Sequence, residues 1–94
     1  FVTADEISEP QNLDLHLSLN GKIVQNSNTS DMIFSVSELI SYMSQFMQLR
    51  CGDIISTGTP SGVGLGMKPP VFLKPGDVME VEVQKCGRQR QEVV

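Results

Sequence analysis

The residue types best suited to chemistry gather in the loop Thr57-Gly58-Thr59-Pro60, which follows a short apolar run. Gly58 lets the backbone approach a ligand closely, and Pro60 fixes its own φ and removes a backbone donor. Thr57 and Thr59 offer hydroxyls and amides that can donate hydrogen bonds to an anionic or carbonyl oxygen. The loop therefore suits a carboxylate or an enolate oxygen, although the same residues are also typical of a tight turn between two strands.

The glycine and serine motifs that follow this loop do not fit other known sites. Gly62, Gly64 and Gly66 form a G-x-G-x-G pattern, which is neither the dinucleotide fingerprint nor a P-loop. Residues 67–70, Met-Lys-Pro-Pro, cannot open the helix that a phosphate site requires. Ser61 is out of register with G-x-S-x-G, and the chain holds a single His, so a serine-hydrolase triad is excluded.

A β-hairpin is predicted in the first third of the chain. Residues 13–19 alternate apolar and polar side chains, as in a half-buried strand, and Asn20-Gly21 is typical of a two-residue hairpin turn. Lys22–Gln25 should therefore return antiparallel. The polar face of the first strand should be exposed to solvent, without a catalytic or ligand-binding role. It carries Asp14, His16 and Ser18.

One helix is predicted, over Ser35–Gln48. Apolar residues recur in this range at helical spacing. Ser35 and Glu38 form an S-x-x-E capping box, and Phe34 can pack on Leu39 across the cap. Gly52 supplies a stop after the helix.

Three further strands are predicted, which makes the chain α+β and mainly β. Asp53–Thr57 would deliver the loop that contains Thr59, and Val78–Val83 would follow the turn Lys74–Asp77. A last strand would end at Val93-Val94. Several strands joined by hairpins, against one helix, favour a mixed or antiparallel sheet.

Composition excludes several classes of protein. The chain has 94 residues, of which 39% are hydrophobic and none is Trp, so one small domain with a modest core is expected. Its net charge is −4 with scattered Lys and Arg, which argues against binding to nucleic acid or an anionic membrane. The apolar runs are far shorter than the roughly 20 residues that cross a bilayer.

Cys51 and Cys86 lie in no C-x-x-C arrangement, and a single His cannot complete a zinc site with them. Reduced thiols of an intracellular protein are therefore expected, cytoplasmic or, in a eukaryote, mitochondrial. The chain begins at Phe1, without an initiator Met or a leader, which favours a segment of a longer protein.

Four blocks of the chain together resemble the carboxy-terminal part of the fumarylacetoacetate hydrolase family. The match is closest to the fumarylacetoacetate hydrolase domain-containing and acylpyruvase-like members, and it runs through essentially all 94 residues in one order. The resemblance implies that residues 1–94 are the carboxy-terminal portion of a single catalytic domain with that family's fold. The four blocks are Val2–Ile7, Asn26–Phe34, Gly52–Gly64 and Lys68–Val78.

The resemblance implies that this chain holds none of the family's catalytic or metal-binding residues. Family members bind Mg²⁺ or Mn²⁺ through a Glu-x-Glu pair and a later Asp, which precede the block matched by Val2–Glu6. The water-activating His and Glu and the active-site Lys also precede it. Glu80-Val81-Glu82 imitates the metal pair but lies near the end, where relatives carry a similar acidic strand. We therefore expect the metal ligands upstream of Phe1, and an inactive isolated chain.

The activity implied by the resemblance is metal-dependent hydrolysis of a carbon–carbon bond in a 3-acylpyruvate or a related β-diketone 2-oxo acid. Thr59 matches the Thr of the family's Gly-Thr-Pro or Gly-Thr-Ile loop, which contacts the substrate's carboxylate or oxo group. Gly58 is assigned to substrate binding with it, on steric grounds. Gln25–Ile33 and Lys68–Phe72 are assigned to the pocket mouth or to a dimer contact, without a choice between the two.

Two alternatives stay open. The first is an oxaloacetate-type decarboxylase or an enol–keto isomerase on the same scaffold, because metal-stabilised enolates serve all three reactions. The second is a truncated, non-catalytic interaction or structural module. The relatives are homodimers, and an incomplete sheet would expose an unpaired edge, so self-association is expected on both counts.

Overall fold

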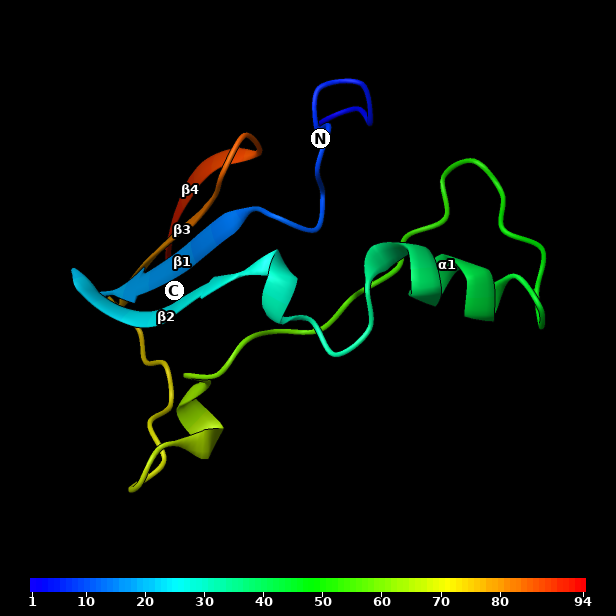
Figure 1. Ribbon diagram of the computed structural model, residues 1–94. Coiled ribbons are helices and arrows are strands. Elements are labelled where there is room, and N and C mark those ends of the chain that lie inside the picture. Colours follow the sequence, from blue (N-terminus) through cyan, green and yellow to red (C-terminus); the bar gives the residue numbers. More distant parts are fainter.

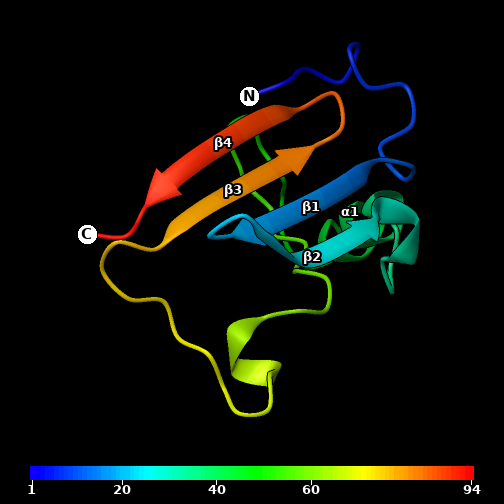
Figure 2. The ribbon, with the colours of Figure 1, turned by 90° about the vertical axis from the view of Figure 1, so that its left-hand side faces the viewer.

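The computed structural model describes residues 1–94 and contains one four-stranded antiparallel sheet, with the strand order β2-β1-β3-β4 (Figure 1). The strands are β1 (Asp14–Leu19), β2 (Lys22–Asn28), β3 (Val78–Val83) and β4 (Gly87–Glu92). Figure 2 shows the four strands side by side. The mainly β, antiparallel architecture expected from the sequence is confirmed.

The long connection between β2 and β3 carries the remaining elements. These are the 3₁₀ turn η1 (Thr29–Asp31), the helix α1 (Val36–Met43) and the 3₁₀ turn η2 (Gly64–Gly66). α1 lies away from the sheet, and the chain after it runs back toward the strands before η2 (Figure 1). The connection therefore returns the predicted ligand-binding loop to the sheet.

The predicted hairpin is present, and β2 is longer than the sequence suggested. Asn20 and Gly21 both adopt positive φ, at 52° and 79°, as a tight two-residue turn between twisted strands requires. Leu17 pairs with Gln25 and Ser18 pairs with Ile23, so a β-bulge interrupts the register beside Val24. Because pairing resumes beyond the bulge, β2 continues to Asn28 rather than ending at Gln25.

The hairpin turn is fastened to the start of β3. The Asn20 side chain donates from Nδ2 to Oδ1 of Asp77, at 2.9 Å, and its Oδ1 accepts from the backbone N–H of Val78, also at 2.9 Å. Asp77 also accepts from the Lys74 backbone N–H. The Asn20 hydrogen bond first and that of Lys74 second lower the pKa of the Asp77 carboxyl, while its desolvation opposes them.

The expectation of a solvent-exposed polar face on β1 is correct for Asp14 and wrong for Ser18. Ser18 is 9% exposed, because β1 is a central strand and the Ser18 side chain is small beside its cross-strand neighbour Glu80. His16 is intermediate, since it pairs with Glu82 on the same face. The polar face of one strand can thus contain both solvent-exposed and buried positions.

The helix begins where predicted and ends earlier. Ser35 caps α1 and forms the predicted capping box: its Oγ accepts from the Glu38 backbone N–H at 3.3 Å, and Glu38 Oε2 accepts from the Ser35 backbone N–H at 2.7 Å. The Ser35 hydroxyl, which donates to Glu38 Oε2 at 2.6 Å, and then the Ser35 backbone N–H lower the pKa of the Glu38 carboxyl. α1 stops at Met43, before the predicted end at Gln48, because the Ser44 hydroxyl donates to the Ser41 carbonyl and no basic residue lies in the last turn.

The predicted strand Asp53–Thr57 is absent. Those residues have no regular secondary structure, and they pair with neither of the edge strands, β2 and β4. The last strand is confirmed, although it ends at Glu92 rather than at Val93-Val94. The backbone N–H of Val93 instead donates to the Asp77 carbonyl.

The chain buries little apolar surface. Leu13 is the one buried apolar residue, and Ile54, Phe72 and Phe46 are among the large side chains left exposed. The radius of gyration is 15.4 Å, against about 12 Å for a compact domain of this length. Neither the helix nor the 3₁₀ turns are long and apolar enough to span a bilayer. These residues are therefore held together by the backbone hydrogen bonds of the sheet and by the Asn20 contacts to Asp77 and Val78, more than by an apolar core.

Candidate ligand-binding cavity

A cavity of about 750 Å³ lies between one face of the sheet and the loop predicted to bind a ligand. Its floor is a row across three strands, formed by Ser27, Leu15 and Val83, which are cross-strand neighbours. Its walls are the segment that leaves β2 and the loop Thr57–Ser61. The volume lies within the usual range for a small-molecule site, roughly 300–1,000 Å³.

The loop wall contains both residues that the sequence assigned to substrate binding. Thr59 and Gly58 line the cavity together with Thr57, and all three are exposed. Gly58 adopts φ +99°, and a Cβ there would meet no atom within 4 Å. The backbone conformation therefore explains the glycine, rather than crowding by other parts of the chain.

The loop wall is hydrogen-bonded to β2 through Gln25. The Gln25 side chain donates from Nε2 to Oγ1 of Thr59 at 2.9 Å and to the Pro60 carbonyl oxygen at 2.9 Å. From the sequence, Gln25 belongs to a block expected at the pocket mouth or at a dimer contact, without an assigned partner. No local motif could have supplied one, because 34 residues separate Gln25 from Thr59.

The opposite wall mixes polar side chains with the apolar Met32, Ile33 and Phe34, and it contains the one ionisable side chain of the cavity, Asp31. The Ser27 hydroxyl donates to Oδ2 of Asp31 at 2.8 Å. Asn28 Oδ1 accepts from the Ser30 backbone N–H, which fixes the start of η1. Most of the block Gln25–Ile33 thus lies at the cavity, whereas Lys68–Phe72 does not line it.

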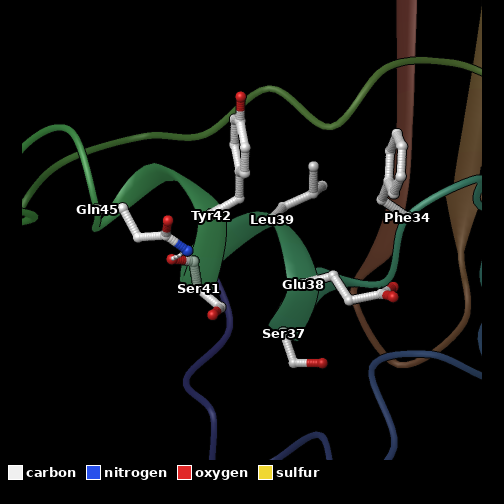
Figure 3. A pocket seen from close by; sticks show the side chains of 7 residues that line it. All are labelled: Phe34, Ser37, Glu38, Leu39, Ser41, Tyr42 and Gln45. Carbon is white, nitrogen blue, oxygen red and sulfur yellow. Dashed lines mark hydrogen bonds between the residues drawn. The ribbon is translucent and has the colours of Figure 1, made fainter.

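A second hollow runs along α1, with a volume of about 850 Å³. Phe34, Leu39 and Tyr42 project to the same side of the helix, and the polar side chains lie lower (Figure 3). It is formed by α1 and by Phe34 and Gln45 beside its two ends, whereas the smaller cavity joins segments far apart in the sequence. We therefore regard the smaller cavity as the candidate site.

The acidic and histidine residues of the sheet lie on the face turned away from the cavity. His16 and Glu82 alternate with the floor residues Leu15 and Val83, so their side chains point the other way. His16 Nε2 lies 3.7 Å from Oε2 of Glu82, and Arg88 pairs with Glu80 at 2.9 Å. These residues belong to a surface polar strip.

The side chains of this chain do not fit a divalent cation. No three His, Cys, Asp or Glu side chains converge on a common point. Cys51 and Cys86 are free and exposed. The polar side chains that line the cavity are the hydroxyls of the loop wall and, across from them, the hydroxyl, amide and carboxylate groups of Ser27, Asn28, Thr29 and Asp31.

The relatives found by comparing sequences and those found by comparing structures agree with one another. The family model described as fumarylacetoacetate (FAA) hydrolase C-terminal matches residues 1–94. The chain is 54% identical to a 2,4-didehydro-3-deoxy-L-rhamnonate hydrolase of Sphingomonas sp. (strain SKA58), over 99% of the chain and 33% of the relative. It is 51% identical to the mitochondrial oxaloacetate tautomerase Fahd2a of Rattus norvegicus, over 93% of the chain and 28% of the relative.

A solved structure with bound ligands shares the fold. Maleylpyruvate hydrolase from Sphingobium sp. SYK-6, in complex with manganese(II) and pyruvate, superposes with a TM-score of 0.87 and 36% identity. The alignment covers 100% of this chain and 33% of that one. The chain spans about a third of the length of the curated relatives it matches. By sequence and by fold, it belongs to the fumarylacetoacetate hydrolase family.

Proposed function

We propose that the complete protein hydrolyses a carbon–carbon bond of a 3-acylpyruvate or a related β-diketone 2-oxo acid. In this proposal residues 1–94 are the carboxy-terminal portion of its catalytic domain and supply the wall that binds the negatively charged end of the substrate. The hydrolase names of two relatives, and the pyruvate bound to one of them, support this substrate class.

The observation that carries the proposal is the state of the Thr59 hydroxyl. The Pro60 carbonyl can only accept, so the Gln25 atom that faces it is the amide nitrogen. The same nitrogen contacts Thr59 Oγ1. Thr59 therefore accepts from Gln25 and keeps its own proton for a further acceptor. In a cavity of this size, that acceptor would be a carboxylate or oxo oxygen of the ligand.

This donor would act where charge develops during the reaction. Water adds to the acyl carbonyl carbon, and the bond from that carbon to C3 of the pyruvate unit breaks. The electron pair passes into the 2-oxo acid, which leaves as an enolate and is then protonated at C3. A hydrogen bond from Thr59 to the oxo acid becomes stronger as the enolate forms, so it favours the transition state over bound substrate.

Other properties of the complete protein are part of the same proposal. We expect it to use Mg²⁺ or Mn²⁺, bound by residues other than those of this chain, because manganese is present in a relative's complex. We expect a homodimer. We also expect an intracellular protein, cytoplasmic or mitochondrial, as the mitochondrial relative suggests.

An enol–keto isomerase or a decarboxylase acting on oxaloacetate is the second candidate. The 51% identity to an oxaloacetate tautomerase favours it specifically. Oxaloacetate also presents a carboxylate beside an oxo group, so the same loop wall would serve. A truncated, non-catalytic interaction or structural module is the third candidate.

A substrate panel separates these candidates. The complete protein with Mn²⁺ is offered a 3-acylpyruvate and oxaloacetate, and pyruvate, CO₂ and the enol content of oxaloacetate are followed. Equimolar pyruvate and carboxylic acid from the acylpyruvate would support the hydrolase. Enol–keto conversion or CO₂ release without cleavage would replace it by the second candidate, and no turnover of either compound would favour the third.

A further inference from the structure

We infer that Gln25 is a positioning residue of the cavity, whose side-chain amide orients the Thr59 hydroxyl so that its proton points to the ligand. The inference rests on the proposed role of Thr59 as a donor. It assigns a role to a residue of β2, outside the loop. The side-chain amide of this residue sets the direction in which the Thr59 hydroxyl donates.

The first support is that Gln25 supplies all the hydrogen bonds of the loop. Residues 54–62 belong to no strand or helix. The hydrogen bonds they make are the two from Gln25 Nε2, to Thr59 Oγ1 and to the Pro60 carbonyl. The hydroxyl direction of Thr59 therefore depends on one amide group.

The second support is a backbone contact at the neighbouring residue of β2. Gly62 adopts φ +104°, and a Cβ at this position would overlap the carbonyl oxygen of Val24. The end of the loop thus packs directly on β2, one residue from Gln25. Two independent contacts place the loop on the same short piece of strand.

The alternation of side chains along β2 turns Gln25 toward the loop. Gln25 pairs with Leu17, and Ser27 pairs with Leu15 of the cavity floor, so Gln25 lies on the same face one row along. The register shifts at the neighbouring residue, Val24, between the pairs Leu17–Gln25 and Ser18–Ile23.

The polarity of the amide makes the inference testable. Gln25 donates, so Thr59 must accept from it and direct its own proton elsewhere. In Gln25→Glu an ionised carboxylate would accept the Thr59 proton and remove it from the ligand. A protonated Glu would donate again and restore the original direction. Gln25→Met keeps the length of the side chain and removes the hydrogen bonds at every pH.

The experiment measures pyruvate binding to the complete Mn²⁺-loaded protein as a function of pH between about 5 and 8. Gln25→Glu should bind pyruvate roughly tenfold more weakly than wild type at pH 8, as expected for a lost hydrogen bond to a charged group. The deficit should shrink toward pH 5 as the Glu side chain takes up a proton, since partial burial beside the Pro60 carbonyl oxygen raises the pKa of such a group. Gln25→Met should show a deficit that does not change with pH relative to wild type.

Two further variants separate this inference from the proposed function. Thr59→Val alone should weaken pyruvate binding, and adding Gln25→Met to it should cause no further loss, because the donor to be oriented is gone. If Thr59→Val binds pyruvate like wild type, the proposed function fails. If Thr59→Val is weakened but the Gln25→Glu deficit is independent of pH, or the two losses add, Gln25 is a structural residue only and the inference is overturned.

Discussion

The four-stranded sheet and the loop Thr57–Ser61 reach their conformations by different means. In the sheet, three antiparallel ladders pair the backbones of neighbouring strands, and Asn20 ties the hairpin turn to Val78 at the start of β3. The loop has no ladder, and one side chain, that of Gln25, provides its hydrogen bonds. Changes in the sheet should therefore alter stability, and changes in the loop wall should alter ligand binding at little cost in stability.

The largest effect is expected in the loop. Thr59→Val in the complete protein should lower kcat/KM by about 10- to 100-fold, because a charged acceptor on the substrate loses its donor. Thr59→Ser keeps the hydroxyl and should stay near wild type. Steady-state kinetics measure the ratio, and thermal unfolding should show no change larger than about 2 °C for either variant. Wild-type kinetics in Thr59→Val would mean that the loop is a turn without a role in binding.

The sheet should respond in the opposite way. Asn20→Ala removes both side-chain hydrogen bonds of the hairpin turn and places a non-glycine residue without a local partner at φ 52°. The midpoint of thermal unfolding should fall by on the order of 5 °C, while KM for the substrate stays within about twofold. A large rise in KM without a loss of stability would contradict the division between the two regions.

A smaller and local effect is expected at the helix start. Ser35→Ala removes the capping hydroxyl of α1, which typically costs about 1 kcal/mol. Because α1 buries none of its residues, the cost should appear as fraying of the helix rather than as global unfolding. Hydrogen exchange of the α1 amides should become about fivefold faster, with the sheet amides unchanged. Faster exchange in β1 or β3 would show that helix and sheet are coupled.

Acid should lower the stability of the sheet by protonating Asp77. Its pKa is lowered in the folded protein, mainly by the Asn20 hydrogen bond. Its contribution to stability is therefore present above the ordinary pKa of an Asp, about 4, and is lost as pH falls through the lowered value. Unfolding followed between about pH 6 and 3 should show this loss in wild type and a shallower slope in Asp77→Asn. Equal slopes would remove Asp77 from the acid response.

Local signals in the sequence were sufficient where structure depends on neighbouring residues. Asn20-Gly21 adopts the positive φ values of its turn, and the Ser35 capping box starts α1. Val78–Val83 is a strand with the predicted bounds. In each case the hydrogen bonds or dihedral angles that matter lie within a few residues of one another.

Long-range pairing explains what the sequence did not predict. The apolar run before Thr57 is extended but forms no strand, because a strand needs a partner and none lies beside it. Ser18 is buried by its neighbours in the sheet, not by its own character. The Gln25–Thr59 hydrogen bond joins residues 34 positions apart in the sequence, which no local pattern announces. The residues of the loop wall were predicted, and the residue that holds them in place was not.

The central claim is that the Thr59 hydroxyl binds the negatively charged end of a 2-oxo acid. The most direct test is the equilibrium binding of pyruvate and of Mn²⁺ to the complete protein and to Thr59→Val. We predict that the Kd for pyruvate rises about tenfold or more, while the Kd for Mn²⁺ is unchanged. A pyruvate Kd equal to that of wild type, in a variant that still binds Mn²⁺, would contradict the account.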